Sequence, residues 1–158
     1  MKISRVLSVI GKIWLIFSLF LLLPVPFSIY FGENTHFVFI LTGASIGLAG
    51  LFTSLVFGRS EEISVKEGLL IVSLGWISVS FFGSLPFLFT GAIPSVTNAF
   101  FESVSGFTTT GASILEDIEV LPKSVLLWRD FIQWLGGMGV IAIAVAIFPF
   151  MGVGGFQL

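Results

Sequence analysis

The sequence predicts an all-α membrane protein that consists of two leading transmembrane helices and one unit of helix, half-helix, extended strand and helix. The membrane class follows from composition, because 56% of the 158 residues are hydrophobic and only 10% are charged. Soluble domains carry about 25% charged residues. The unit of helix, half-helix, strand and helix is predicted because one apolar segment is too short to cross a bilayer and precedes the uncharged sequence GFTTTGAS.

The first two apolar runs have the length of membrane spans. Residues 13–31 and 37–57 contain no charged side chain, and about 20 apolar residues in a helix cross the hydrocarbon core. Residues 1–12 are basic, but the run that follows contains prolines and shows no small-residue cleavage site, which favours a retained helix over a removed signal peptide. We therefore expect residues 1–62 to form two leading transmembrane helices.

Gly43 and Gly47 lie four residues apart in the second run and share one face of the predicted helix. Small residues at this spacing let two membrane helices approach closely. The ordinary glycine content of membrane helices is the alternative explanation, and the sequence does not choose between them.

Residues 63–158 are expected to hold the remaining elements. A third transmembrane helix is predicted over 68–93 and a last one over 125–150, since both runs are long and almost free of charge. Between them, residues 97–106 form at most a half-helix of about 15 Å, half the thickness of the hydrocarbon core. Pro94 with Ser95 or Thr97 suits its start, and Gly106 suits its end.

Residues 108–113 follow the half-helix as a predicted extended strand. Non-helical backbone at membrane depth is tolerated only where it is buried in protein or lines a watery path. Backbone carbonyls and threonine hydroxyls offer oxygens that replace the hydration shell of an alkali cation. The carboxyl end of the half-helix, which is partly negative, favours a cation at the same place. A loose external loop is the alternative.

The distribution of basic residues predicts the orientation. Five fall on the side of the N-terminus and two on the other side. The first group is Lys2, Arg5, Lys12, Arg59 and Lys66, and the second is Lys123 and Arg129. The N-terminus is therefore expected in the cytoplasm, and the segment 94–113 must enter and leave the membrane from the outer face.

Several classes of function are excluded by composition. The chain lacks cysteine and has a single histidine, His36, so neither a thiolate nor a histidine cluster is available for metal binding or catalysis. We expect no enzyme and no cofactor, and His36 is expected at the external surface. The net charge of −2 argues against a nucleic-acid partner, which requires a basic surface.

Two further groups of residues are expected to support the strand. Arg129 lies near the start of the last helix, and a charge in lipid must face protein or reach outward to water. We expect Arg129 to pair with Glu102 of the half-helix or with a carboxylate elsewhere; an unpaired interfacial position is the alternative. Gly136, Gly137 and Gly139 are expected to permit close packing on the strand, with helix bending as the alternative.

The stretch AFFESVSGFTTTGAS and the sequence from Leu121 to Leu158 resemble the first repeat of TrkH-type subunits of the Trk/Ktr/HKT superfamily of potassium transporters. The resemblance implies a helix–pore-helix–filter–helix unit that occurs four times around one pore in pseudo-fourfold symmetry. The implied potassium filter is formed by Thr108, Thr109, Thr110, Gly111 and Ala112. Potassium-selective members of the superfamily keep glycine at the position of Gly111, whereas some sodium-permeable relatives have serine there.

The resemblance also implies function and partners. We expect a multi-pass protein of a bacterial or archaeal cytoplasmic membrane, surrounded by lipid, that takes up K⁺. The chain contains one such unit, so it is expected to be the N-terminal part of a longer subunit whose remaining repeats complete the pore. A homodimer and a cytosolic nucleotide-binding regulatory subunit are the implied partners. A self-assembling homotetrameric channel and a non-transporting membrane scaffold are the alternatives.

Overall fold

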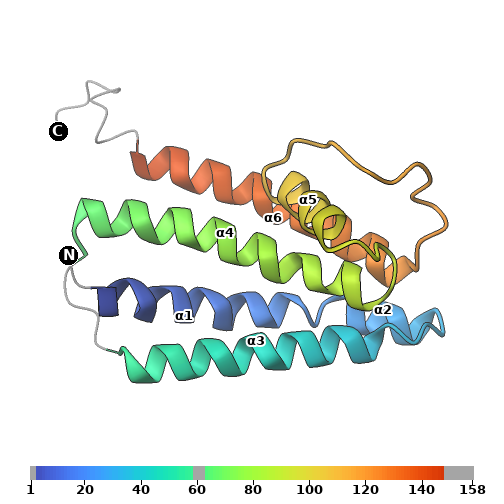
Figure 1. The fold of residues 1–158 in the computed structure, drawn as a ribbon, viewed down its shortest axis with the longest axis horizontal. Coiled ribbons are helices and arrows are strands. Elements are labelled where there is room, and N and C mark those ends of the chain that lie inside the picture. The colour runs from blue at the N-terminus through green and yellow to red at the C-terminus, as the bar shows by residue number, and fades with distance from the viewer. Residues whose placement is uncertain (1–2, 59–62, 148–158) are drawn as a thin grey trace.

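The computed structural model describes residues 3–58 and 63–147, and the prediction of an all-helical chain is confirmed there. The helices are α1 (Ile3–Phe20), α2 (Pro24–Tyr30), α3 (His36–Val56), α4 (Val65–Phe89), α5 (Val96–Phe107) and α6 (Lys123–Ile147). The four long helices α1, α3, α4 and α6 lie side by side (Figure 1). The short helices α2 and α5 lie toward one end of this bundle, together with the segment that follows α5 (Figure 1).

Among the described residues, three helical segments are long and apolar enough to cross a membrane: Ile3–Tyr30, His36–Val56 and Val65–Phe89. Helix α6 has 25 residues. It begins two residues before the predicted start at 125, and positions 148–150 of the predicted last span lie outside the described residues. That α6 crosses the membrane remains a prediction.

The first span differs from its predicted bounds. It begins at Ile3 rather than at residue 13, and it is interrupted between α1 and α2. The interruption follows from Pro24, which has no N–H to donate and whose ring clashes with the carbonyl four residues earlier. Pro24 is instead the first residue of α2, where a missing N–H costs nothing.

Helix α4 begins earlier than the predicted 68–93 because its start is capped. The Ser64 side chain accepts the Glu67 N–H, and the Glu67 carboxylate accepts the Ser64 N–H at 3.0 Å, which together form a capping box. The helix ends at Phe89, four residues before the predicted end, and Gly91 then adopts a φ of 75°. Its carboxyl end and the start of α6 lie at the same end of the bundle (Figure 1).

Helices α1 and α3 pack backbone against backbone. A Cβ added at Gly43 would lie 3.2 Å from the Ser18 carbonyl oxygen, and one at Gly47 would lie 3.0 Å from the Ser18 hydroxyl. The close-approach interpretation of these two glycines is therefore confirmed. The glycine face continues to Gly50, where an added Cβ would lie 2.7 Å from the Gly11 carbonyl oxygen.

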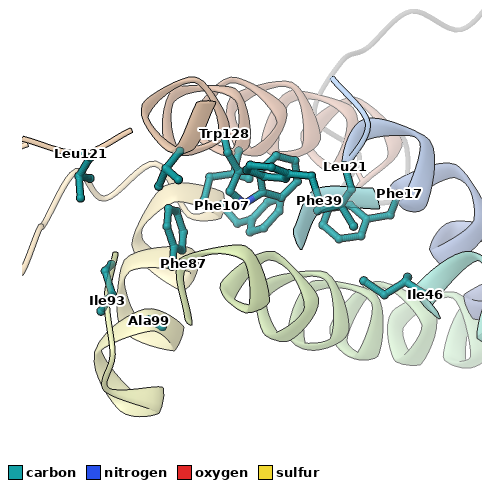
Figure 2. Packing of buried hydrophobic residues seen from close by; sticks show 12 residues of the cluster. Phe17, Leu21, Phe39, Ile46, Phe87, Ile93, Ala99, Phe107, Leu121 and Trp128 are labelled. Atoms are coloured by element: carbon teal, nitrogen blue, oxygen red, sulfur yellow. The ribbon is translucent and has the colours of Figure 1, made fainter. Parts of the chain in front are cut away.

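One hydrophobic core joins the leading helices to the later elements. Trp128 of α6 is fully buried and lies among Phe17 of α1, Phe39 of α3 and Phe131 of its own helix. Figure 2 shows Phe107, from the end of α5, beside the same cluster. The two parts that the sequence analysis distinguishes, 1–62 and 63–158, thus contribute to one shared core. Helix α6 packs against residues of both parts.

Helix α6 approaches the end of α5 so closely that only glycine fits. A Cβ added at Gly136 would lie 2.1 Å from the Phe107 carbonyl oxygen. One turn earlier, Ile132 fills the space beside Gly106, where an added Cβ would lie 2.8 Å from the isoleucine side chain. Gly139 packs in the same way on the Trp76 ring of α4. Close packing is therefore the observed use of Gly136 and Gly139, but it is against α5 and α4 rather than against the predicted strand. Of the three glycines, Gly137 alone lies beside the threonine-rich sequence, where an added Cβ would lie at an ordinary contact distance of 3.8 Å from the Thr109 methyl carbon.

We predict that Gly50→Ala lowers the free energy of unfolding by about 1–3 kcal/mol, because the new methyl group overlaps backbone atoms of α1. Gly68→Ala is the matched control, since nothing lies within 4 Å of a Cβ added there. Unfolding of the purified complete chain in detergent micelles measures both. Equal stability of the two variants would contradict the packing described for α1 and α3.

Gly136→Ala is predicted to cost a similar amount, about 1–3 kcal/mol, and to loosen the end of α5. Its neighbour supplies the control, because the nearest atom to a Cβ added at Gly137 is the Thr109 methyl carbon, at 3.8 Å. Amide hydrogen exchange measured on residues 108–110 is expected to speed up in Gly136→Ala and to stay unchanged in Gly137→Ala. Unchanged exchange in both variants would show that α6 does not hold α5 through this contact.

Candidate functional site

The threonine-rich segment, residues 108–113, follows α5 as a turn and then as irregular backbone. It is not a regular strand, which corrects the predicted extended strand. The physical reason lies in Thr108 and Thr109, whose N–H groups still bond to carbonyls of α5 and so continue the chain as a turn. All six residues are exposed in this chain.

The backbone of this segment is held from the α5 side. The N–H groups of Thr108, Thr109 and Thr110 donate to carbonyls of α5 at 2.9–3.0 Å. The Ser105 hydroxyl donates to the Ala112 carbonyl. Within the described part of the chain, no hydrogen bond is made to the carbonyl oxygens of Thr109, Thr110 or Gly111. These three oxygens are therefore available to a ligand while the chain around them is fixed.

Two residues of the segment adopt positive φ angles. Thr109 has a φ of 53° and Gly111 has a φ of 73°, and Thr109 is the sole non-glycine residue with positive φ among those described. The left-handed region costs an L-residue with a Cβ about 1–2 kcal/mol. Strain of this kind persists where the surroundings over-determine the backbone, and it clusters at functional sites.

Glu102 fixes the far end of the segment from within α5. Its side chain is buried, with 2% exposed. The carboxylate accepts the Ser113 hydroxyl at 3.0 and 3.1 Å and the Ile114 N–H at 3.2 Å. A buried carboxylate needs such donors, because burial of an unpaired charge costs several kcal/mol.

Arg129 of α6 completes the environment of this carboxylate. Its Nε donates to the Glu102 carboxylate at 2.7 Å, and 17% of its side chain is exposed. The expected pairing of Arg129 with Glu102 is thus present, and the unpaired alternative is not. Asp130 lies 3.8 Å from the same guanidinium, but its side chain is 74% exposed. Glu102 is therefore the partner that is shielded from water.

Helix α5 is anchored to α4 on its other side. The Ser103 hydroxyl donates to the Ser80 carbonyl of α4 at 2.7 Å. Helix α6 is joined to α4 as well, because the Trp128 indole N–H donates to the Gly83 carbonyl at 2.9 Å. The Ser95 hydroxyl accepts the Asn98 N–H and so caps the start of the helix. Trp128 is a buried packing residue.

A second polar cluster lies where the loop between α2 and α3 meets the start of α6. The Glu33 carboxylate accepts the N–H groups of Lys123 and Ser124 and the Ser124 hydroxyl. His36, expected at the surface, is partly buried here, and its Nδ1 lies 2.9 Å from the Glu33 carbonyl oxygen. Sequence reasoning missed this cluster, because no spacing connects residues that lie 90 positions apart.

These contacts set the direction in which the pKa of Glu33 shifts. Burial alone raises the pKa of this carboxyl group, but the hydrogen bonds from Ser124, Lys123 and Thr35 outweigh burial and lower the pKa. Because the folded-state pKa lies below the unfolded value, the carboxylate stabilises the fold fully above the unfolded pKa. That contribution is lost as the pH falls through the lowered folded-state pKa.

Comparison with known proteins connects this geometry to one family. Residues 34–158 match the profile of the TrkH family, described as a cation transport protein. The chain is 39% identical to the Trk system potassium uptake protein TrkH of Halomonas elongata, over all of this chain and 33% of that protein. It is 36% identical to the protein of the same name from Escherichia coli, again over all of this chain and 33% of that protein.

The same relationship holds for a solved structure. The crystal structure of the potassium transporter TrkH from Vibrio parahaemolyticus matches 99% of this chain and 34% of that chain, with a TM-score of 0.90 and 37% sequence identity. The chain therefore spans about a third of the length of the proteins that it matches. On the strength of the profile match and of these similarities, the chain belongs to the TrkH family of cation transport proteins.

Proposed function

We propose that this chain is the N-terminal portion of a potassium uptake subunit in the cytoplasmic membrane, and that residues 108–112 form one wall of its K⁺ filter. The relatives named above are potassium uptake proteins, and each match covers about a third of their length. The N-terminus lies in the cytoplasm in this proposal, so α5 and the threonine-rich segment enter from the outer face. The remaining repeats of the complete chain supply the other walls.

One observation carries the proposal: a segment whose carbonyl oxygens have no partner among residues 3–58 and 63–147 is fixed by hydrogen bonds on both sides of those oxygens. Thr110 donates its N–H to the Ser105 carbonyl, and Ser113 donates its hydroxyl to Glu102. Carbonyl dipoles that are already in place substitute for the water around a K⁺ ion. The segment follows the carboxyl end of α5, whose partial negative charge also favours a cation.

The backbone conformation supports the same function. An extended chain directs successive carbonyls to opposite sides, and positive φ angles at alternate residues reverse this alternation. Thr109 and Gly111 have positive φ, and Thr110 between them does not. Such a backbone is suited to bring successive carbonyl oxygens to one side, where a dehydrated cation binds. Glu102 and Arg129 act as structural support and do not contact the ion in this proposal.

A single segment surrounds an ion from one side only. We propose that the equivalent segments come from the same polypeptide, in pseudo-fourfold symmetry, rather than from four copies of residues 1–158. The complete subunit is proposed to form a homodimer that a cytosolic nucleotide-binding subunit regulates, as the family resemblance implies.

The direct test is potassium-dependent growth of an uptake-deficient strain that carries the complete gene. We expect the complete gene to restore growth at low K⁺, and Gly111→Arg to abolish it.

Gly111→Ser is expected to raise the rate of Na⁺ entry relative to K⁺. Serine at this φ costs about 1–2 kcal/mol whatever its surroundings, so a control with the same strain is needed.

Gly91→Ser is that control. Gly91 has a φ of 75° and, like Gly111, has nothing within 4 Å of an added Cβ. It lies in the turn between α4 and α5 and is not one of the proposed filter residues. If both serine variants shift the ratio of Na⁺ to K⁺ uptake equally, the filter assignment is wrong. Rescue by residues 1–158 alone would instead support the homotetrameric channel.

Arg129→Gln is predicted to lower K⁺ uptake by about tenfold or more, because it leaves the buried Glu102 carboxylate without its cation. Adding Glu102→Gln to that variant removes the uncompensated charge and is expected to restore part of the uptake. Asp130→Asn is the control, since its side chain is mostly exposed. Rubidium uptake, normalised to the amount of protein in the membrane, measures all three; normal uptake by Arg129→Gln would rule out this support role.

A further inference from the structure

The start of α6 is capped by a side chain from a distant part of the chain. Lys123 and Ser124 are the first residues of α6, and their N–H groups have no partner within the helix. The preceding Pro122 has no side-chain acceptor to offer them. The Glu33 carboxylate takes this place, and its bond to the Ser124 N–H measures 3.1 Å. A carboxylate also complements the partial positive charge at a helix N-terminus.

A second layer of hydrogen bonds holds this carboxylate. The Thr35 hydroxyl lies 2.6 Å from the Ser124 hydroxyl, and the Ser28 hydroxyl lies 2.8 Å from that of Thr35. Ser28 also donates to the Glu33 carbonyl at 3.0 Å. Both Ser28 and Ser124 are fully buried. We call Ser28, Glu33, Thr35, His36 and Ser124 the Glu33 clamp; it connects the α2–α3 loop to α6 through partly buried polar contacts.

Helix α6 carries the contacts that hold α5 and the threonine-rich segment. Along one rigid helix, Trp128 bonds to α4, Arg129 bonds to Glu102, and Gly136 packs on the Phe107 carbonyl. A shift of α6 along its axis, or a rotation about it, changes all three contacts together. The Arg129 contact is the most sensitive, because a charge-assisted hydrogen bond of 2.7 Å depends steeply on position.

We propose that Glu33 is a positioning residue for the filter, which sets the place of α6 and thereby the Arg129–Glu102 pair behind the threonine-rich segment. This inference rests on the proposed function and adds to it a role for the leading helices. They take part in ion selectivity, although none of their residues contacts the threonine-rich segment through a hydrogen bond in the described part of the chain.

The test uses the complete transporter reconstituted in liposomes, with Glu33→Ala, Glu33→Asp and the control Glu116→Ala. Glu116 is exposed and makes no hydrogen bond in the described part of the chain. Its replacement therefore removes one negative charge, as Glu33→Ala does, but leaves the Glu33 clamp intact. We expect Glu33→Ala to reduce the ratio of K⁺ to Na⁺ flux by about fivefold, a change within the range of coupling that a chain of packed residues carries. Glu33→Asp is expected to recover part of the ratio, and Glu116→Ala to leave it unchanged.

A double variant shows whether Glu33 acts through α6. In an Arg129→Gln background, Glu33→Ala is expected to change the flux ratio by less than about twofold, because the contact that it positions is already lost. If the two effects multiply instead, Glu33 does not act through Arg129 and the proposal fails. It also fails if Glu33→Ala lowers thermal stability but leaves the flux ratio unchanged, since that is the result of a merely structural role.

Hydrogen exchange separates this inference from the proposed function. The Thr110 and Ile114 amides bond to Ser105 and Glu102, so faster exchange at both in Glu33→Ala reports loss of position without any transport measurement. If the unsubstituted transporter moves no K⁺ but this exchange still responds, the proposed function fails and the positioning role stands. If exchange changes only at Lys123 and Ser124, the positioning role is overturned. Should Glu33→Ala fail to fold, Glu33→Gln, which keeps one acceptor oxygen, serves in the same measurements.

Discussion

The threonine-rich segment depends on the hydrogen bonds that the buried Glu102 carboxylate accepts from Ser113 and Ile114. Irregular backbone inside a membrane protein must find partners for its polar groups or line a watery path. In this segment, some polar groups have a protein partner and others are left for water or an ion. The N–H groups of Thr108, Thr109 and Thr110 and the Ser113 hydroxyl bond to α5. The carbonyls of Thr109, Thr110 and Gly111 remain unpaired among the described residues. Glu102 supplies the acceptors for the Ser113 hydroxyl and the Ile114 N–H in the part of the chain that the structure describes, so its loss would release this end of the segment.

Glu102 in turn depends on helix packing at some distance from the segment. Its cation comes from α6, and α6 is placed by Trp128 in the shared core, by Gly136 against Phe107 and by Glu33 at its start. The leading helices α1 and α3 contribute Phe17 and Phe39 to the same core. They therefore support the later elements directly, which gives them a structural purpose beyond anchoring the chain in lipid.

Much of this arrangement could be predicted from the sequence, because local signals determine it. Charge-free runs indicate spans, Ser95 indicates the start of α5, and Gly43 and Gly47 four residues apart indicate a close helix contact. The pairing of Arg129 with Glu102 was one of the expected arrangements, because a charge near the membrane must face protein or reach water, but the sequence did not exclude another carboxylate or an unpaired position. The start of α4 lies earlier than predicted because the capping box of Ser64 and Glu67 outweighs the charge pattern.

Other features depend on three-dimensional proximity, so no sequence pattern announces them. The Glu33 clamp joins residues about 90 positions apart. The interruption at Pro24 is different, because proline is a local signal, but the prediction from apolar composition treated the run as continuous. The threonine-rich segment is irregular rather than a strand, because its first N–H groups bond back to α5.

The most direct measurement of the central claim is an anomalous difference map from crystals of the complete chain soaked in Tl⁺, a heavy substitute for K⁺. The account predicts a peak in contact with the carbonyl oxygens of Thr109, Thr110 and Gly111, with the Glu102–Arg129 pair behind them. A Tl⁺ peak elsewhere along the pathway, with none against these three residues, would contradict it.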